Sequence, residues 1–138
     1  MGQTYAEIEL VSGEDLLHAR RGNLDMDAIR RIRITALADT GAIYLAINEN
    51  IQEYLQLPVV ENRRFQLANG EVTHYLIVGP IDIRFQNRQA SGNAIVLPGD
   101  AEPLLGCIPM EDLDVLIDPL RQELVVNPKH PDYAVHRL

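Results

Sequence analysis

The sequence predicts an all-β fold, mainly strands with one or two short helices, in a single domain over residues 1–138. Val, Ile and Leu are abundant and spread along the chain, which favours strands over a helical bundle. Residues 59–97 hold successive apolar stretches separated by turn residues, a pattern typical of strands joined by hairpins. At 138 residues, one domain can bury a sizeable core.

The first predicted strand covers residues 4–11, where alternating polar and apolar residues indicate one solvated face. Further strands are expected at residues 32–38, 59–67, 72–78, 81–85, 94–97, 104–105 and 124–126. Gly79-Pro80 and Gly92-Asn93 are expected to be turns between strands.

Helical features begin at Ser12, which has an acidic residue, Asp15, three positions later, as at many helix starts. This pattern predicts a short helix at 15–20, inside a segment of helical or irregular structure over 12–29. Apolar spacing predicts a second helix over 48–57, closed by Pro58.

A third helix is expected at 110–116, after Pro109, with Leu113 and Leu116 facing a core. Residues 127–138 form a polar tail that contains two prolines.

Asn69-Gly70 is a strong hairpin signal between the strands at 59–67 and 72–78. Both residues tolerate the left-handed conformation of a type I′ turn, so a two-residue turn is expected there.

The net charge of −8 makes nucleic acid an unlikely partner, because the average field repels phosphate. No stretch approaches 18 apolar residues and the amino terminus does not resemble a signal peptide, so no membrane association is expected. The single cysteine, Cys107, excludes an intrachain disulfide and fits a cytoplasmic protein. The four histidines lack metal-ligand spacing, so no metal site is expected.

Asp39-Thr40-Gly41 is the motif that carries chemistry, and it occurs once in the chain. It follows the apolar residues that end the predicted strand at 32–38. A structural acid that caps a turn would explain Asp39 from local sequence alone. The downstream sequence argues for more, because Leu104-Leu105-Gly106 precedes a helix as a second apolar-apolar-glycine segment.

Together these features resemble the retropepsin-like aspartic proteases, single-domain relatives of pepsin that include retroviral and bacterial members. The resemblance rests on Asp39-Thr40-Gly41-Ala42, the hairpin tip at Asn69-Gly70 and residues 104–106, and covers about residues 32–126. It implies a pepsin-like half-barrel and an aspartic endopeptidase. It implies no cofactor.

In this family two aspartates about 3 Å apart share one proton, since two like charges at that distance cannot both ionise readily. The ionised acid activates a water and its protonated partner donates to the developing oxyanion. Because the chain offers one such aspartate, Asp39, the resemblance implies a homodimer that pairs it with its symmetry mate.

The resemblance also assigns supporting roles. Thr40 would brace the paired loops, and Gly41 would let the backbone pass close to the carboxylate. The hairpin at 67–72 would be the flap that closes over an extended peptide substrate. The residues expected to line the substrate pocket are Ala42, Tyr44, Leu67, Ala68 and Leu104.

Two positions depart from the retroviral pattern. Retroviral members carry an acid two positions after the glycine and an arginine after the second glycine, where this chain has Ile43 and Cys107. Both charges are absent together, so no buried charge is left unpaired, and an apolar contact could replace the ion pair. Cys107 is expected to be a buried free thiol rather than a nucleophile.

A second function stays open alongside the protease. A dimeric peptide-binding or scaffold protein could keep this fold without turnover, because a fold alone does not establish chemistry. The intact Asp39-Thr40-Gly41 triplet favours the enzyme, since a pure binding protein has little reason to keep two facing carboxylates.

Overall fold

The all-β prediction is confirmed by the computed structural model, which describes residues 2–138; Met1 lies outside the described residues. Strands make up 46% of the chain and helices 18%, so strands dominate the architecture. The strands are β1 (Thr4–Ser12), β2 (Arg31–Ala38), β3 (Leu45–Asn48), β4 (Val59–Gln66), β5 (Val72–Phe85), β6 (Arg88–Leu97), β7 (Leu104–Leu105), β8 (Val115–Asp118) and β9 (Glu123–Val126). The helices are α1 (Gly13–Arg20), the 3₁₀ turn η1 (Met26–Ala28), α2 (Glu49–Leu55) and α3 (Cys107–Leu113).

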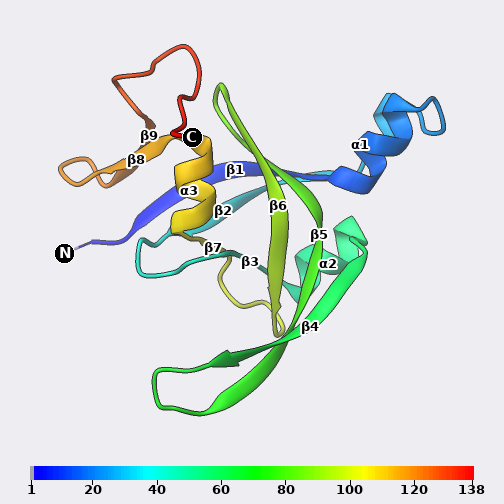
Figure 1. The fold of residues 1–138 in the computed structure, drawn as a ribbon, viewed down its shortest axis with the longest axis horizontal. Coiled ribbons are helices and arrows are strands. Elements are labelled where there is room, and N and C mark those ends of the chain that lie inside the picture. The colour runs from blue at the N-terminus through cyan, green and yellow to red at the C-terminus, as the bar shows by residue number, and fades with distance from the viewer. Residues whose placement is uncertain (1) are drawn as a thin grey trace.

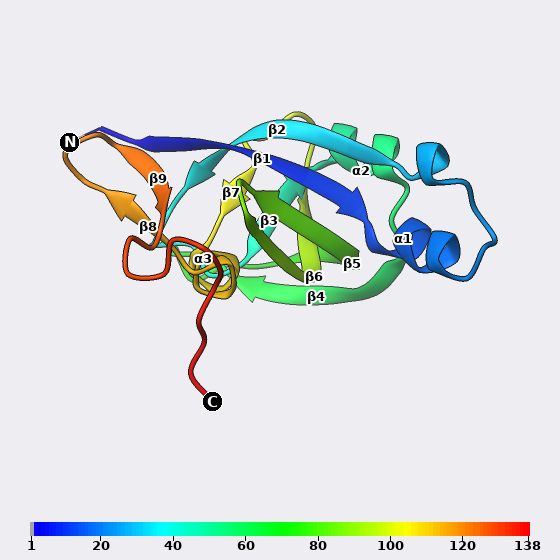
Figure 2. The ribbon, with the colours of Figure 1, turned by 90° about the horizontal axis from the view of Figure 1, so that it is seen from above.

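Seven strands form one mixed sheet in the order β1-β2-β7-β3-β6-β5-β4, and β1 also pairs with β5. This extra pairing closes six strands into a ring, in the order β1, β2, β7, β3, β6 and β5, and leaves β4 outside the ring (Figures 1 and 2). The pairs β2–β7 and β3–β6 are parallel, whereas β3–β7 is antiparallel. The remaining strands, β8 and β9, form a separate two-stranded sheet beside the amino terminus.

The core fills this ring with aliphatic side chains from every part of the chain. The largest fully buried hydrophobic side chains are Ile8, Leu10, Val11, Leu45, Ile47, Leu55, Val78, Ile81, Leu105 and Leu113. Burial alternates along β1, as the sequence pattern predicts for a strand with one solvated face.

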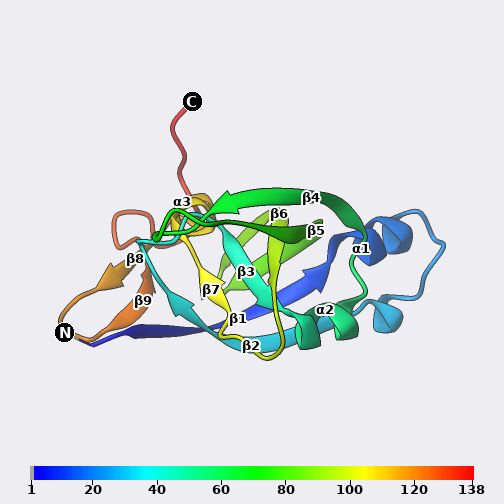
Figure 3. The same cartoon turned by 90° about the horizontal axis from the view of Figure 1, so that it is seen from below.

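Both amino-terminal helices begin with side-chain caps. The Ser12 hydroxyl accepts a hydrogen bond from the Asp15 N–H at 3.2 Å, which confirms the predicted start of α1. Asn48 caps α2 in the same way through the Ile51 N–H, at 2.9 Å. Helix α2 packs against β2 and β3 (Figure 3) and ends at Gln56, which adopts a left-handed conformation with φ 52°.

The two strands predicted at 72–78 and 81–85 are one strand, β5, so the turn expected at Gly79-Pro80 is wrong. A bulge between Val78 and Ile81 accommodates these residues, since a proline without an N–H is tolerated where the ladder is already interrupted. Gly92-Asn93 likewise lies inside β6, opposite this bulge, and is not a turn. The chain reverses at Gln86-Asn87 instead, where Gln86 has φ 51°.

The third helix begins earlier than predicted, at Cys107 rather than after Pro109. The N–H groups of Cys107 and Ile108 donate to neighbouring loop carbonyls, and Pro109 fits the first helical turn because its missing N–H has no partner there. Leu113 faces the core as predicted, but Leu116 lies in β8 and is exposed.

The carboxyl-terminal tail has no helix or strand, yet it is fastened to the body. Asp114 accepts hydrogen bonds from the Asn127 amide at 3.0 Å and the Val135 N–H at 3.0 Å, and contacts His130 Nδ1 at 2.7 Å. Arg88, almost fully buried at the start of β6, donates to the His130 carbonyl. These contacts hold the polar tail against α3 and the β5–β6 hairpin.

Replacing Leu105 with Ala should lower the free energy of unfolding by about 2–5 kcal/mol, because it leaves a cavity between β2 and β3. Leu105 is 0% exposed, whereas Leu120 is 95% exposed and provides the matched control. Leu120→Ala should change stability by less than about 0.5 kcal/mol in urea unfolding. Equal effects of the two substitutions would contradict this packing.

Asp114→Asn should remove one component of the pH dependence of stability. The hydrogen bond from the Val135 N–H, with those from Asn127 and His130, lowers the pKa of Asp114 from 3.8 to about 2. The carboxylate therefore stabilises the fold fully above pH 3.8, and this contribution is lost as the pH falls toward 2.

Urea unfolding from pH 2 to pH 6 tests this by comparing the wild type, Asp114→Asn and the exposed control Asp100→Asn. The stability difference between the wild type and Asp114→Asn should shrink with falling pH. A constant difference would rule out the assigned contacts.

Candidate active site

Asp39 lies directly after β2, on a turn that the neighbouring strand β7 holds in place. The Leu37 N–H donates to the Pro103 carbonyl at 2.9 Å, and the Asp39 N–H donates to the Leu105 carbonyl at 3.0 Å. Because β2 and β7 run parallel, the ends of both strands reach the same edge of the sheet. The Asp39 turn and residues 104–106 therefore lie side by side.

The Asp-Thr-Gly turn fixes one oxygen of the carboxylate. Asp39 Oδ1 accepts the Gly41 N–H at 2.8 Å, and the Ala42 N–H donates to the Asp39 carbonyl at 3.1 Å. Within residues 2–138, Oδ2 has no hydrogen-bond partner. Asp39 is half-buried whereas Thr40 and Gly41 are exposed, so one carboxylate oxygen is positioned and the other is available.

Gly106 makes the contact between the two loops sterically feasible. A Cβ at this position would lie 2.6 Å from the Ile43 carbonyl carbon and the Tyr44 oxygen, both backbone atoms. The Cys107 N–H donates to the Ala42 carbonyl at 2.9 Å, and the Ile108 N–H donates to the Ile43 carbonyl at 3.0 Å. The first helical N–H groups of α3 thus brace the segment that follows the Asp39 turn.

The two positions that depart from the retroviral pattern are neighbours in space. Cys107 Sγ lies 4.0 Å from the Ile43 carbonyl oxygen. Cys107 is half-buried rather than fully buried as expected, because it occupies the first turn of α3.

The β4–β5 hairpin carries an exposed tip at residues 67–71, but the predicted two-residue turn is wrong. The Gly70 N–H donates to the Leu67 carbonyl at 2.9 Å, and only Gly70, with φ 88°, is left-handed, while Asn69 is not. Asn69 instead accepts the Glu71 N–H through Oδ1 at 2.9 Å. These contacts fit a type I turn followed by a left-handed glycine.

An aromatic cluster connects this hairpin to the loop after Asp39. The rings of Tyr44 and Phe65 meet edge to face with centroids 6.2 Å apart, and Phe65 also lies 5.7 Å from Tyr75. Sequence reasoning identified Tyr44 but missed Phe65 and Tyr75. Phe65 and Tyr75 lie on opposite arms of the predicted hairpin, and this placement could have predicted that their rings lie close together.

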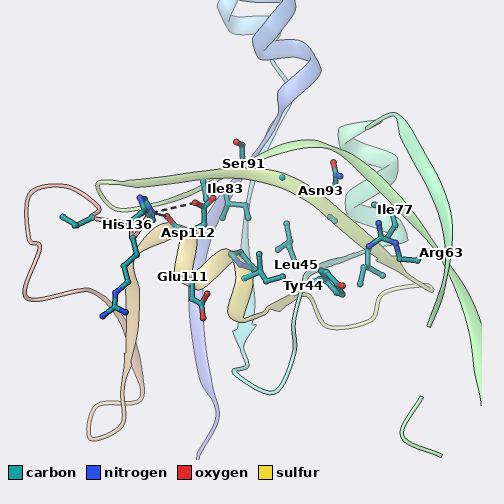
Figure 4. A pocket seen from close by; sticks show the side chains of 18 residues that line it. Tyr44, Leu45, Arg63, Ile77, Ile83, Ser91, Asn93, Glu111, Asp112 and His136 are labelled. Atoms are coloured by element: carbon teal, nitrogen blue, oxygen red, sulfur yellow. Dashed lines mark hydrogen bonds and ion pairs between the residues drawn. The ribbon is translucent and has the colours of Figure 1, made fainter. Parts of the chain in front are cut away.

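A cavity of about 680 Å³ lies between β6 and α3, next to this cluster (Figure 4). Tyr44 lines it, but Asp39 does not, and neither do the other expected pocket residues, Ala42, Leu67, Ala68 and Leu104. The tail contributes residues 135–137 to its wall, which sequence analysis could not anticipate. The cavity therefore reaches the loop after the Asp39 turn at Tyr44, but Asp39 itself does not line it.

Two further classes of site are absent from the part of the chain that the structure describes. No group of three or more His, Cys, Asp or Glu residues there is arranged to hold a metal ion. Over the same residues, no helix combines the length and apolar character needed to span a membrane.

Comparison with known families agrees with the geometry of the Asp39 turn. A family described as aspartyl protease matches residues 28–111, more than half of the chain. The matched region includes the Asp39 turn, the β4–β5 hairpin and the start of α3. No curated protein matches the chain.

Gly106→Ala should lower the free energy of unfolding by roughly 1–3 kcal/mol, since the new methyl group must displace the backbone at Ile43 and Tyr44. Gly92→Ala is the matched control, because a Cβ there meets no atom within 4 Å. It should be neutral or slightly stabilising. Thermal and urea unfolding distinguish the two, and equal stabilities would argue against close contact of the loops.

Proposed function

The chain belongs to the aspartyl protease family, and we propose that it is an aspartic endopeptidase whose active site forms between two copies of the chain. The observation that supports this proposal is the geometry of the Asp39 carboxylate. It is half-buried and held through Oδ1 by the Gly41 N–H, while Oδ2 has no hydrogen-bond partner among residues 2–138. This arrangement supports a carboxylate that is oriented by the fold and open to a water or a second acid.

The need for two copies follows from the number of suitable acids. Asp39 is the only aspartate in an Asp-Thr-Gly context. Asp82 is buried beside Gln89, and Asp114 is occupied by the tail. A twofold axis beside Asp39 would bring it against its symmetry mate, because an isologous interface places equivalent residues together at the axis.

The proposed mechanism is acid–base catalysis by this pair. Two carboxylates at hydrogen-bonding distance share one proton and titrate as a unit. The ionised Asp39 takes a proton from a bound water as the water attacks the scissile carbonyl carbon. The protonated Asp39 of the other copy donates its proton to the carbonyl oxygen, which gives a tetrahedral gem-diol. As this intermediate collapses, the first Asp39 returns the proton from the water to the leaving amine nitrogen, and the other copy takes back the proton from the gem-diol hydroxyl.

Neighbouring residues take supporting roles in this proposal. Gly41 supplies the N–H that orients Asp39, and the exposed Thr40 hydroxyl is available to the partner's loop. The exposed hairpin tip at 67–71 would cover an extended peptide, with Phe65 against Tyr44 as the contact at its base. Ala42 and residues 104–106 hold the two loops together.

Asp39→Asn should reduce cleavage of an unfolded protein substrate by at least about 10²–10⁴-fold, since the amide cannot act as the acid or the base. Digests across the acid range, with mass measured in the same buffers, test this, and Asp27→Asn is the exposed control. A statine-type transition-state mimic should bind the wild type far more tightly than a substrate peptide does.

Mixing the wild type with excess Asp39→Asn protein tests whether the site is shared. Subunit exchange should lower activity well below the value expected from dilution, because mixed dimers hold one acid. If activity stays proportional to the wild-type concentration alone, the result would argue for an active site formed by a single chain. A stable dimer that neither cleaves nor binds the mimic would favour the peptide-binding alternative.

A further inference from the structure

The cavity between β6 and α3 is left unused by the mechanism proposed above. Its floor is apolar and includes Ile77, Ile83, Ala90 and Ala94, all of them buried. Along one side run the exposed residues 91–93 of β6, and α3 forms the other side. A cavity of about 680 Å³ with an apolar floor is large enough to receive several side chains of a ligand.

The β6 side of this cavity is an unpaired strand edge. One edge of β6 pairs with β5, and β3 covers the other edge only at Ile95–Leu97. Among the described residues, no strand covers that second edge over 89–94. Because alternate residues of an antiparallel strand direct N–H and C=O away from their partner, this edge offers free donors and acceptors.

Gly92 provides the space for an occupant. Alternate residues of a strand lie on one face, so Gly92 shares a face with the buried Ala90 and Ala94, although Gly92 itself is exposed. A Cβ on Gly92 would nevertheless meet no atom within 4 Å, and its backbone is not left-handed. The glycine therefore serves no turn, and its missing side chain leaves the cavity open directly above the strand.

The cavity is continuous with the proposed substrate-binding region through Tyr44. The Tyr44 ring lines the cavity and also contacts Phe65 at the base of the hairpin. On the α3 side, Ile108 lines the cavity and its N–H holds the Ile43 carbonyl. Tyr44 and Ile108 thus connect the cavity to the loop that follows the Asp39 turn.

Charge favours a basic occupant. The α3 wall carries Glu111 and Asp112, and the chain as a whole has a net charge of −8. Of the cations that line the cavity, Arg63 is paired with Glu61, and His136 lies 3.8 Å from Asp112 Oδ1, which leaves Arg137 at the tail end. Glu111 has no ion-pair partner among residues 2–138, so it is the acid available to an occupant. Residues 91–93 are uncharged, so the strand edge itself adds no charge to the cavity.

From these observations we propose that the cavity is a distal substrate site, in which an extended basic segment of the protein substrate adds as a strand to β6. Backbone hydrogen bonds to residues 89–94 hold the segment, an aliphatic side chain enters above Gly92, and a Lys or Arg side chain meets Glu111. This proposal rests on the proposed protease function, because it extends the peptide cleft of that enzyme.

The test measures binding with the full-length Asp39→Asn protein, so that cleavage cannot intervene. The probe is a capped peptide of alternating Lys and Val, about eight residues long, enough to pair along one strand. Amide hydrogen exchange followed by NMR should show protection at residues 89–94 when the peptide binds. A Glu-Val peptide of the same length is the charge control and should bind at least about tenfold more weakly.

Two variants make the test specific. Gly92→Leu fills the cavity and should weaken binding of the Lys-Val peptide by at least about tenfold, whereas Thr35→Leu, on the exposed face of β2, should not. Glu111→Lys should weaken binding several-fold without touching the core, and Glu53→Lys on α2 is its matched control. This second pair keeps the test informative if the leucine variant does not fold.

The proposal is overturned if the peptide leaves the amides of residues 89–94 unprotected, or protects only the hairpin tip. It is also overturned if Gly92→Leu and Glu111→Lys both bind like the wild type. Protection of the same edge that rises with protein concentration, without peptide, would assign the site to a second copy instead. If the wild type does not cleave any substrate, only the proposed protease function is contradicted. The peptide-binding assay does not depend on turnover, so its result still decides whether this site exists.

Discussion

The strand β7 is the constraint on which the rest of the site depends. It has two residues, and Leu105 pairs with both Ala38 of β2 and Leu45 of β3. This insertion fixes the two ends of the segment that contains Asp39. The Ile43 and Tyr44 backbone then lies so close to Gly106 that no side chain fits there without a shift of the backbone.

The same arrangement is the basis for proposing a site shared between two chains. Both loops reach one edge of the sheet, but only the first carries an acid, and the second supplies glycine and the start of α3. Among residues 2–138, the Asp39 carboxylate has no second carboxyl group with which to share a proton. Pairing with a second copy would supply that partner, and it would make activity depend on protein concentration.

Asp114 connects this region to the tail. It ends α3 in a left-handed conformation with φ 55° and accepts hydrogen bonds from the tail at Asn127 and Val135. Since the first turn of α3 braces the loop after Asp39 and its C-cap residue, Asp114, binds the tail, one short helix links this loop to the carboxyl-terminal tail. The tail thereby becomes a wall of the cavity beside β6.

Local sequence accounts for the features that depend on neighbouring residues: the caps at Ser12 and Asn48, the hairpin around Gly70 and the Asp39 turn after an apolar strand. Tertiary structure decided what depends on distant partners. Strand β5 continues through Gly79-Pro80 because β6 pairs with it on both sides of the bulge, and the tail is ordered by Asp114. Such contacts join segments far apart in the chain, so no local pattern encodes them.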